Sequence, residues 1–128
     1  MRVIHGRHYS REEANALLPE LETMIAELKS ARDRLTDAEA HAALAEAAPT
    51  NGGGAGGRKV GEAFLAVRGL LAELERREIV LRDIDRGLVD FPAIVEGREA
   101  YLCWELGEDE IAHWHDLETG FAGRRPLD

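Results

Sequence analysis

Apolar residues recur along the first third of the chain at alternating spacings of three and four. The run starts after Ser10, which forms with Glu13 the Ser-x-x-Glu capping box of a helix N-terminus. Its members are Ala14, Leu17, Leu21, Met24, Leu28, Ala31, Leu35, Ala38, Ala42 and Ala45. This seam predicts a long, coiled-coil-like helix over residues 10–48. Pro19 removes one backbone donor inside the run, so we expect a kink there rather than an end.

A Gly-rich stretch separates this helix from a second periodic segment. Residues 49–57 are rich in glycine, which is typical of a flexible connector. Residues 58–86 are then expected to form a second helix with one broad apolar face: Val60, Phe64, Val67, Leu70, Leu71, Leu74, Leu81 and Ile84. The two helices are expected to form an antiparallel hairpin. Its seam is Ala-rich near the connector and widens at the other end, where Leu18 and Ile25 add to it.

The uneven hairpin needs partners at both ends. At the wide end, residues 87–128 supply five of the seven aromatic side chains and can cover it. At the narrow end, a pair of Ala-seamed helices buries too little apolar surface to offset its ordering entropy. We therefore expect a homodimer that forms through the hairpin.

The C-terminal segment predicts a three-stranded antiparallel sheet. Glu96-Gly97 is a two-residue hairpin signal, and Gly107-Glu108-Asp109 separates the second strand from the third. If Val95 pairs with Arg98 and Leu106 with Glu110, the apolar side chains of all three strands fall on one face. That face includes both Trp104 and Trp114, and Pro92 then lies on an edge strand. The fold class is therefore α+β, a single domain over residues 1–128 with the sheet packed at the wide end of the hairpin.

The opposite face of this sheet carries the candidate chemistry. Its metal-ligating side chains are Asp90, Cys103, Glu105, His113 and His115. Residues directly across a strand pair have Cβ atoms about 4.5–5.5 Å apart, so thiolate, imidazole and carboxylate groups converge there. Such a donor set suits Zn²⁺ or another divalent transition metal. The same residues would also be unremarkable on the solvated face of a half-buried sheet, and no motif such as CxxC or HExxH is present.

A competing interpretation makes residues 109–119 a helix. Glu110 and His113 would then have the Glu-x-x-His spacing of di-metal helical bundles, with Glu78 and Asp85 of the second helix as further carboxylates. Nucleophilic catalysis through Cys103 lacks a recognisable orienting group or oxyanion hole. The sequence thus favours a non-enzymatic role over an enzymatic one. Two such roles stay open: metal binding, and an interaction or scaffolding module.

Charge and composition limit the classes of binding partner and the cellular compartment to be expected. Sixteen Lys and Arg against 25 Asp and Glu give a formal net charge of −9, with no basic run, which argues against nucleic acid and anionic membranes. No apolar stretch approaches the roughly 20 residues of a membrane span. The N-terminus lacks the apolar run of a signal peptide. Cys103 is the single cysteine. We expect a cytoplasmic protein with no membrane partner.

Several motifs together resemble an uncharacterised bacterial family, domain of unknown function family 2203. They are Tyr9-Ser10 with Glu12-Glu13-Ala14-Asn15, Leu17-Leu18-Pro19-Glu20-Leu21, Leu88-Val89-Asp90-Phe91-Pro92-Ala93, Gly97-Arg98-Glu99, Tyr101-Leu102-Cys103-Trp104, Leu106-Gly107-Glu108, Trp114-His115 and Gly120-Phe121-Ala122-Gly123-Arg124. His113 and Arg125 depart from the family pattern, which has an aromatic residue and a Gln there. The resemblance spans the chain and implies no activity.

Overall fold

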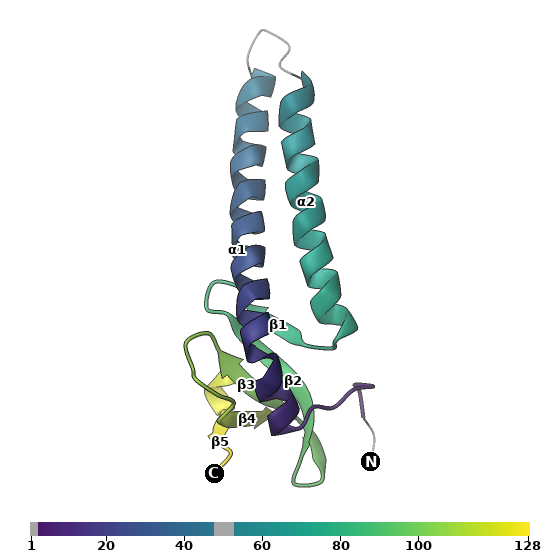
Figure 1. Cartoon of the computed structure of the whole chain (residues 1–128), viewed down its shortest axis with the longest axis vertical. Helices are drawn as coiled ribbons and strands as arrows, with labels where there is room; N and C mark the ends of the chain where they lie inside the picture. Colours follow the sequence, from purple (N-terminus) through teal and green to yellow (C-terminus); the bar gives the residue numbers. More distant parts are fainter. Residues whose placement is uncertain (1–2, 48–52) are drawn as a thin grey trace. The chain divides into compact units, whose positions relative to one another are not determined.

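The computed structural model describes residues 3–47 and 53–128 (Figure 1). The elements in chain order are α1 (Arg11–Ala47), α2 (Gly53–Arg76), β1 (Val80–Asp83), β2 (Leu88–Val95), β3 (Arg98–Glu105), β4 (His113–Asp116), the 3₁₀ turn η1 (Phe121–Gly123) and β5 (Arg125–Pro126). They confirm the α+β class. The contacts define two compact units: the chain up to Thr23 together with Leu74–Asp128, and the stretch Met24–Glu73. That the two units fold as a single domain stays a prediction.

The start of α1 follows the predicted capping box. The backbone N–H of Glu13 donates to the Ser10 hydroxyl at 3.1 Å, and the N–H of Ser10 donates to the Glu13 carboxylate at 2.9 Å. Two backbone donors that have no partner inside the helix are thereby satisfied. The helix then continues through Pro19, as expected.

The second helix differs from its predicted bounds at both ends. α2 already includes Gly53–Gly57, which we had assigned to the connector, and it ends at Arg76 instead of continuing to residue 86. The rest of the predicted connector, up to residue 52, lies outside the described residues.

A Schellman motif explains why α2 ends where it does. The N–H of Ile79 donates to the Leu74 carbonyl and that of Glu78 to the Glu75 carbonyl, with Glu78 in the left-handed region at a φ of 57°. The side chains of Leu74 and Ile79 are both buried, which completes the motif. Because a glutamate occupies the position where glycine is usual, the sequence carries no recognisable stop signal.

The sheet has five strands rather than the three that were predicted. All neighbours are antiparallel and follow the chain order β1-β2-β3-β4-β5. The additional β1 takes residues that had been assigned to the second helix, and β5 adds the C-terminal tail as a further edge. β2 is therefore not an edge strand along Leu88–Asp90, where β1 pairs with it; Pro92 lies beyond that pairing.

The predicted register between β2, β3 and β4 is confirmed. Val95 lies opposite Arg98, Asp90 opposite Cys103, and Cys103 opposite His113. Because alternate residues share a face, this register places Trp104 and Trp114 on one side, where they are 0% and 8% exposed. The helical interpretation of residues 109–119 is wrong, since residues 113–116 form a strand.

Both faces of the sheet are covered. Figure 1 shows the first turns of α1 lying across the sheet, and the Tyr9 ring just before α1 packs edge-on against Phe91. On the opposite face, Asp90, Cys103 and His115 are each only 1% exposed. These three candidate residues therefore do not lie on a solvated face, and each buried polar group needs a partner. The side chains of Glu105 and His113 are 30% and 34% exposed.

In the unit Met24–Glu73, α1 and α2 lie side by side and run in opposite directions (Figure 1). Ala31, Ala38 and Ala63 are buried, whereas Phe64 and Leu71 of the predicted apolar face are 51% and 43% exposed. The narrow, Ala-rich face of α1 therefore does not cover the broad apolar face of α2. Neither helix, over its described residues, is long and apolar enough to span a membrane.

Candidate metal centre

Three neighbouring strands bring together three potential ligands on one face of the sheet. Asp90 comes from β2, Cys103 from the central strand β3 and His115 from β4. One carboxylate oxygen, the Cys103 Sγ and one imidazole nitrogen all lie within 4.8 Å of one another. The carboxylate of Asp90 and the ring of His115 meet across β3, and the short Cys103 side chain between their strands leaves room for that contact.

Hydrogen bonds hold the imidazole and the carboxylate in place. His115 Nε2 lies 2.9 Å from Asp90 Oδ1, and His115 Nδ1 lies 2.7 Å from the carbonyl oxygen of Asp116. Arg82 donates from its Nε to the other carboxylate oxygen, Asp90 Oδ2, at 2.8 Å. Both nitrogens of His115 thus face acceptors, so the ring satisfies both contacts as an imidazolium that donates from each nitrogen.

The electrostatics of His115 agree with this assignment. Burial acts to lower its pKa, but hydrogen bonds to the Asp90 carboxylate and the Asp116 carbonyl outweigh burial and raise the pKa above the usual 6.5. A buried imidazolium paired with a buried carboxylate avoids leaving either charge without a partner.

Cys103 is a neutral thiol in this environment. Burial, and next the negative charge of Asp90, raise its pKa from 9.0 to about 12. A thiol with so high a pKa is a poor nucleophile at neutral pH, because only the thiolate attacks. The arrangement therefore disfavours Cys103 as a nucleophile, and a metal ion that binds here has to displace the thiol proton.

The other two predicted ligands, Glu105 and His113, lie outside this group of three. Glu105 is bound by the guanidinium of Arg86 from the turn before β2. His113 accepts a hydrogen bond on Nδ1 from Arg124, which also binds Glu108. Each side chain is thus drawn away from Asp90 by an arginine that the strand register alone could not place.

One residue of the site, Arg82, was missed by sequence reasoning. The predicted second helix over residues 58–86 includes Arg82, and only β1 places it beside Asp90. Tyr101 lies opposite His115, and their rings contact at a tilt of 47° with 5.5 Å between the centroids. A signal for β1 was available: Val80-Leu81-Arg82-Asp83 ends close to Gly87, whose φ of 63° makes the turn into β2.

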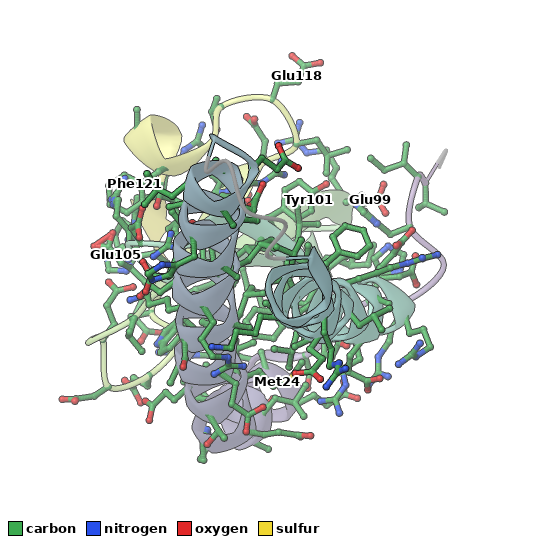
Figure 2. All side chains as sticks on the ribbon, turned by 90° about the horizontal axis from the view of Figure 1, so that it is seen from above. Met24, Glu99, Tyr101, Glu105, Glu118 and Phe121 are labelled. Carbon is green, nitrogen blue, oxygen red and sulfur yellow. The ribbon has the colours of Figure 1, made fainter. Side chains whose placement is uncertain are left out.

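The N-terminal arm, residues 3–9, covers one side of this face. Glu99, whose side chain is 2% exposed, accepts hydrogen bonds from the N–H groups of Ile4 and His5 and from His8 Nε2. His5 Nε2 lies 2.7 Å from the Tyr101 hydroxyl. Figure 2 shows Glu99 and Tyr101 beside this arm, with Phe121 and Glu105 on the opposite side of the view. His5 and His8 are half-buried because of these contacts.

The carboxylates of the helical di-metal interpretation are engaged elsewhere. Glu78 accepts the N–H of Gly6 at 3.0 Å, and Glu110 lies 3.7 Å from Arg11. Neither residue belongs to the group of three ligands found among the described residues.

A small cavity adjoins the three ligands. It has a volume of about 210 Å³ and is lined by Asp90, Cys103 and His115 together with Arg82, Leu88, Leu117, Glu118, Gly120 and Phe121. The loop between β4 and β5 forms its outer wall.

Comparison with known proteins places the chain in one family. The family model of an uncharacterized conserved protein, DUF2203, matches residues 7–127, so the chain belongs to this family. A search of the curated proteins found no match, and a search of the solved structures found none either. The match confirms the resemblance found in the sequence.

Proposed function

We propose that this member of the DUF2203 family binds a divalent transition metal, foremost Zn²⁺, through Asp90, Cys103 and His115. The observation that carries the proposal is that three buried donors of different type lie within 4.8 Å of one another. Carboxylate, thiolate and imidazole are all ligands that zinc takes in proteins. Rigid neighbouring strands hold such ligands with less freedom than loops do.

The surrounding hydrogen bonds suit a metal site. A metal-ligating histidine commonly donates its second ring N–H to a backbone carbonyl, which fixes the tautomer. The 2.7 Å contact from His115 Nδ1 to the Asp116 carbonyl provides such a bond and makes Nε2 the ligand atom. Arg82 similarly orients Asp90 by binding one carboxylate oxygen, so that the other remains for the ion.

Charge balance also supports the proposal. Without an ion, the charges of Asp90 and the His115 imidazolium cancel, Cys103 is neutral, and Arg82 leaves a single positive charge. An ion with two positive charges that displaces one proton from His115 and one from Cys103 leaves the same net charge. The exchange therefore adds no charge to a buried cluster, where unbalanced charge is expensive.

Metal titration of protein purified without an affinity tag tests the proposal. We expect Co²⁺ to produce a thiolate charge-transfer band and Zn²⁺ to displace Co²⁺. Cys103→Ser should abolish the band, and His115→Ala should lower the affinity about 100-fold or more. His113→Ala is the matched control, because it lies on the same strand but outside the ligand group, and it should bind normally.

Proton release gives a second readout. Calorimetric titrations in buffers of different ionisation enthalpy should show about two protons released per ion, and about one for Cys103→Ser. If the wild-type protein gives no charge-transfer band and Cys103 reacts equally fast with and without metal, the site does not bind metal.

A second candidate function is self-association through α2, as a scaffolding module. Phe64, Leu65 and Leu71 are 51%, 63% and 43% exposed on this helix, which favours a second copy as partner. Sedimentation at micromolar concentration should show a dimer, and Leu65→Lys should shift it towards monomer. Leu44→Lys on α1 is the control, since Leu44 is equally apolar and 71% exposed. A wild-type protein that sediments as a monomer would contradict this candidate.

The proposal takes the cytoplasm as its compartment. A reducing environment keeps a free cysteine available as a ligand.

A further inference from the structure

We infer that the cavity beside the three ligands binds a small monoanion, a carboxylate or similar oxyanion, between the metal ion and Arg82. The inference rests on the proposed metal site and adds the class of ligand that the site takes. It follows from the ligand count, the shape of the cavity and the distribution of charge.

The ligand count leaves one coordination position for an external group. Zinc in proteins is usually four-coordinate, and sites that act on a ligand keep three protein donors with the fourth position open. The group found among the described residues has three members, and each of them also lines the cavity of about 210 Å³. The fourth position is therefore expected to face that space.

The size of the cavity limits the ligand. Pockets that hold drug-sized molecules measure about 300–1,000 Å³, and this cavity is smaller. Leu88, Leu117 and Phe121 give it apolar walls, which suit the short hydrocarbon part of a small carboxylate.

Arg82 provides the positive wall. Its Nε is used by Asp90, and its guanidinium lies 5.1 Å from the centroid of the Tyr101 ring. The guanidinium also donates to the Tyr101 hydroxyl, and its remaining terminal N–H groups belong to a side chain that is 43% exposed. An arginine fixed at Nε can therefore present its outer edge to an oxyanion.

The sign of the charge favours an anion. Arg82 lines the cavity with its guanidinium, and a divalent ion bound to the three ligands adds positive charge beside it, so a monoanion suits the space between them. Glu118 also lines the cavity, but Figure 2 shows its carboxylate pointing away from the fold. Phe121, at the outer wall, lies under the guanidinium groups of Arg86 and Arg124, at 4.4 and 4.7 Å from its ring centroid.

Titration of the Co²⁺-loaded protein with sodium acetate or sodium azide tests the inference, with sodium perchlorate as the control for ionic strength. We expect acetate and azide to change the visible d–d bands saturably, because an anion that enters the fourth position changes the ligand field. Arg82→Gln, measured at saturating Co²⁺, should weaken anion binding about tenfold. Arg98→Gln, which removes an exposed arginine of β3, should leave it unchanged.

A second variant separates the cavity from the metal ligands. Leu117→Trp should fill the cavity and abolish the anion response while Co²⁺ still binds, even if Arg82→Gln proves to lower metal affinity. If Co²⁺ binds but acetate and azide leave its spectrum unchanged, the site is closed and this inference fails alone. The same conclusion follows if both variants respond to anions like the wild type. If Co²⁺ does not bind, the proposed function fails and the inference with it.

Discussion

Asp90 links two positive groups, and its removal should alter stability in a pH-dependent way. The pKa of His115 is raised in the folded protein, so its pairing with Asp90 stabilises fully below about pH 6.5 and this contribution is lost as pH rises through the folded-state pKa. Asp90→Asn should therefore lower the free energy of unfolding by about 3 kcal/mol near pH 6, and by less towards pH 9. Urea denaturation with a chelator present measures both values.

The control for this prediction is Asp109→Asn, an exposed carboxylate in the loop before β4. It should lower stability little and equally at every pH. An Asp90→Asn effect that grows as pH rises would show that His115 is not an imidazolium in the folded protein.

At the scale of single elements, the turn between β1 and β2 depends on Gly87. Its φ of 63° is unfavourable for other residues, and an added Cβ would lie 2.5 Å from the Cβ of Leu106. Gly87→Ala should destabilise by about 2–4 kcal/mol, from backbone strain and steric overlap together. Gly97, with a φ of 78° and open space around it, is the matched control. Gly97→Ala should lower the free energy of unfolding by only about 1 kcal/mol. Thermal unfolding of the two variants therefore separates the cost of backbone strain from that of steric overlap.

One buried carboxylate, that of Glu99, accepts three hydrogen bonds from the N-terminal arm. Burial acts to raise the pKa of Glu99, but hydrogen bonds from Ile4, His8 and His5 outweigh burial and lower it. Glu99→Gln replaces one acceptor oxygen by a donor, so hydrogen exchange at the amides of residues 4–8 should accelerate about tenfold or more. Glu96→Gln in the adjacent turn should leave exchange unchanged.

The same depressed pKa has a consequence in acid. A carboxylate whose folded-state pKa is lowered stabilises above its unfolded value of 4.5, and the contribution is lost as pH falls through the folded-state value. The wild-type arm should therefore be released in acid. Glu99→Gln should lack this transition, and an arm that stays protected in Glu99→Gln would contradict the anchoring role of Glu99.

Across the whole molecule, the buried side chains are divided unevenly between the two units. Most of the core residues lie in the unit that contains the sheet, whereas Met24–Glu73 contributes Met24, Ile25, Leu28, Ala31, Ala38 and Ala63. Local stability follows the density of buried apolar contacts. Hydrogen exchange should therefore be slowest in β2 and β3 and faster in residues 31–47 of α1. Equal protection in both would contradict this expectation, and protection that rises with protein concentration would point to the dimer.

The sequence by itself determined the features that depend on local chemistry and on alternation. The capping box at Ser10 and Glu13 involves residues three apart, and one turn at Glu96-Gly97 sets the register that places Asp90 opposite Cys103. Because strand side chains alternate strictly between faces, a correct turn predicts every neighbour along the two strands.

Only the tertiary structure decided which of the predicted ligands meet. Glu105 and His113 share the face of Cys103, but arginines distant in the sequence bind them, whereas Arg82 reaches Asp90 only because α2 ends at Arg76. That end depends on Glu78 in a left-handed conformation, which no local preference of glutamate predicts. A long, flexible charged side chain pairs with an opposite charge that lies near it in space, and the complete fold determines which charges lie near one another.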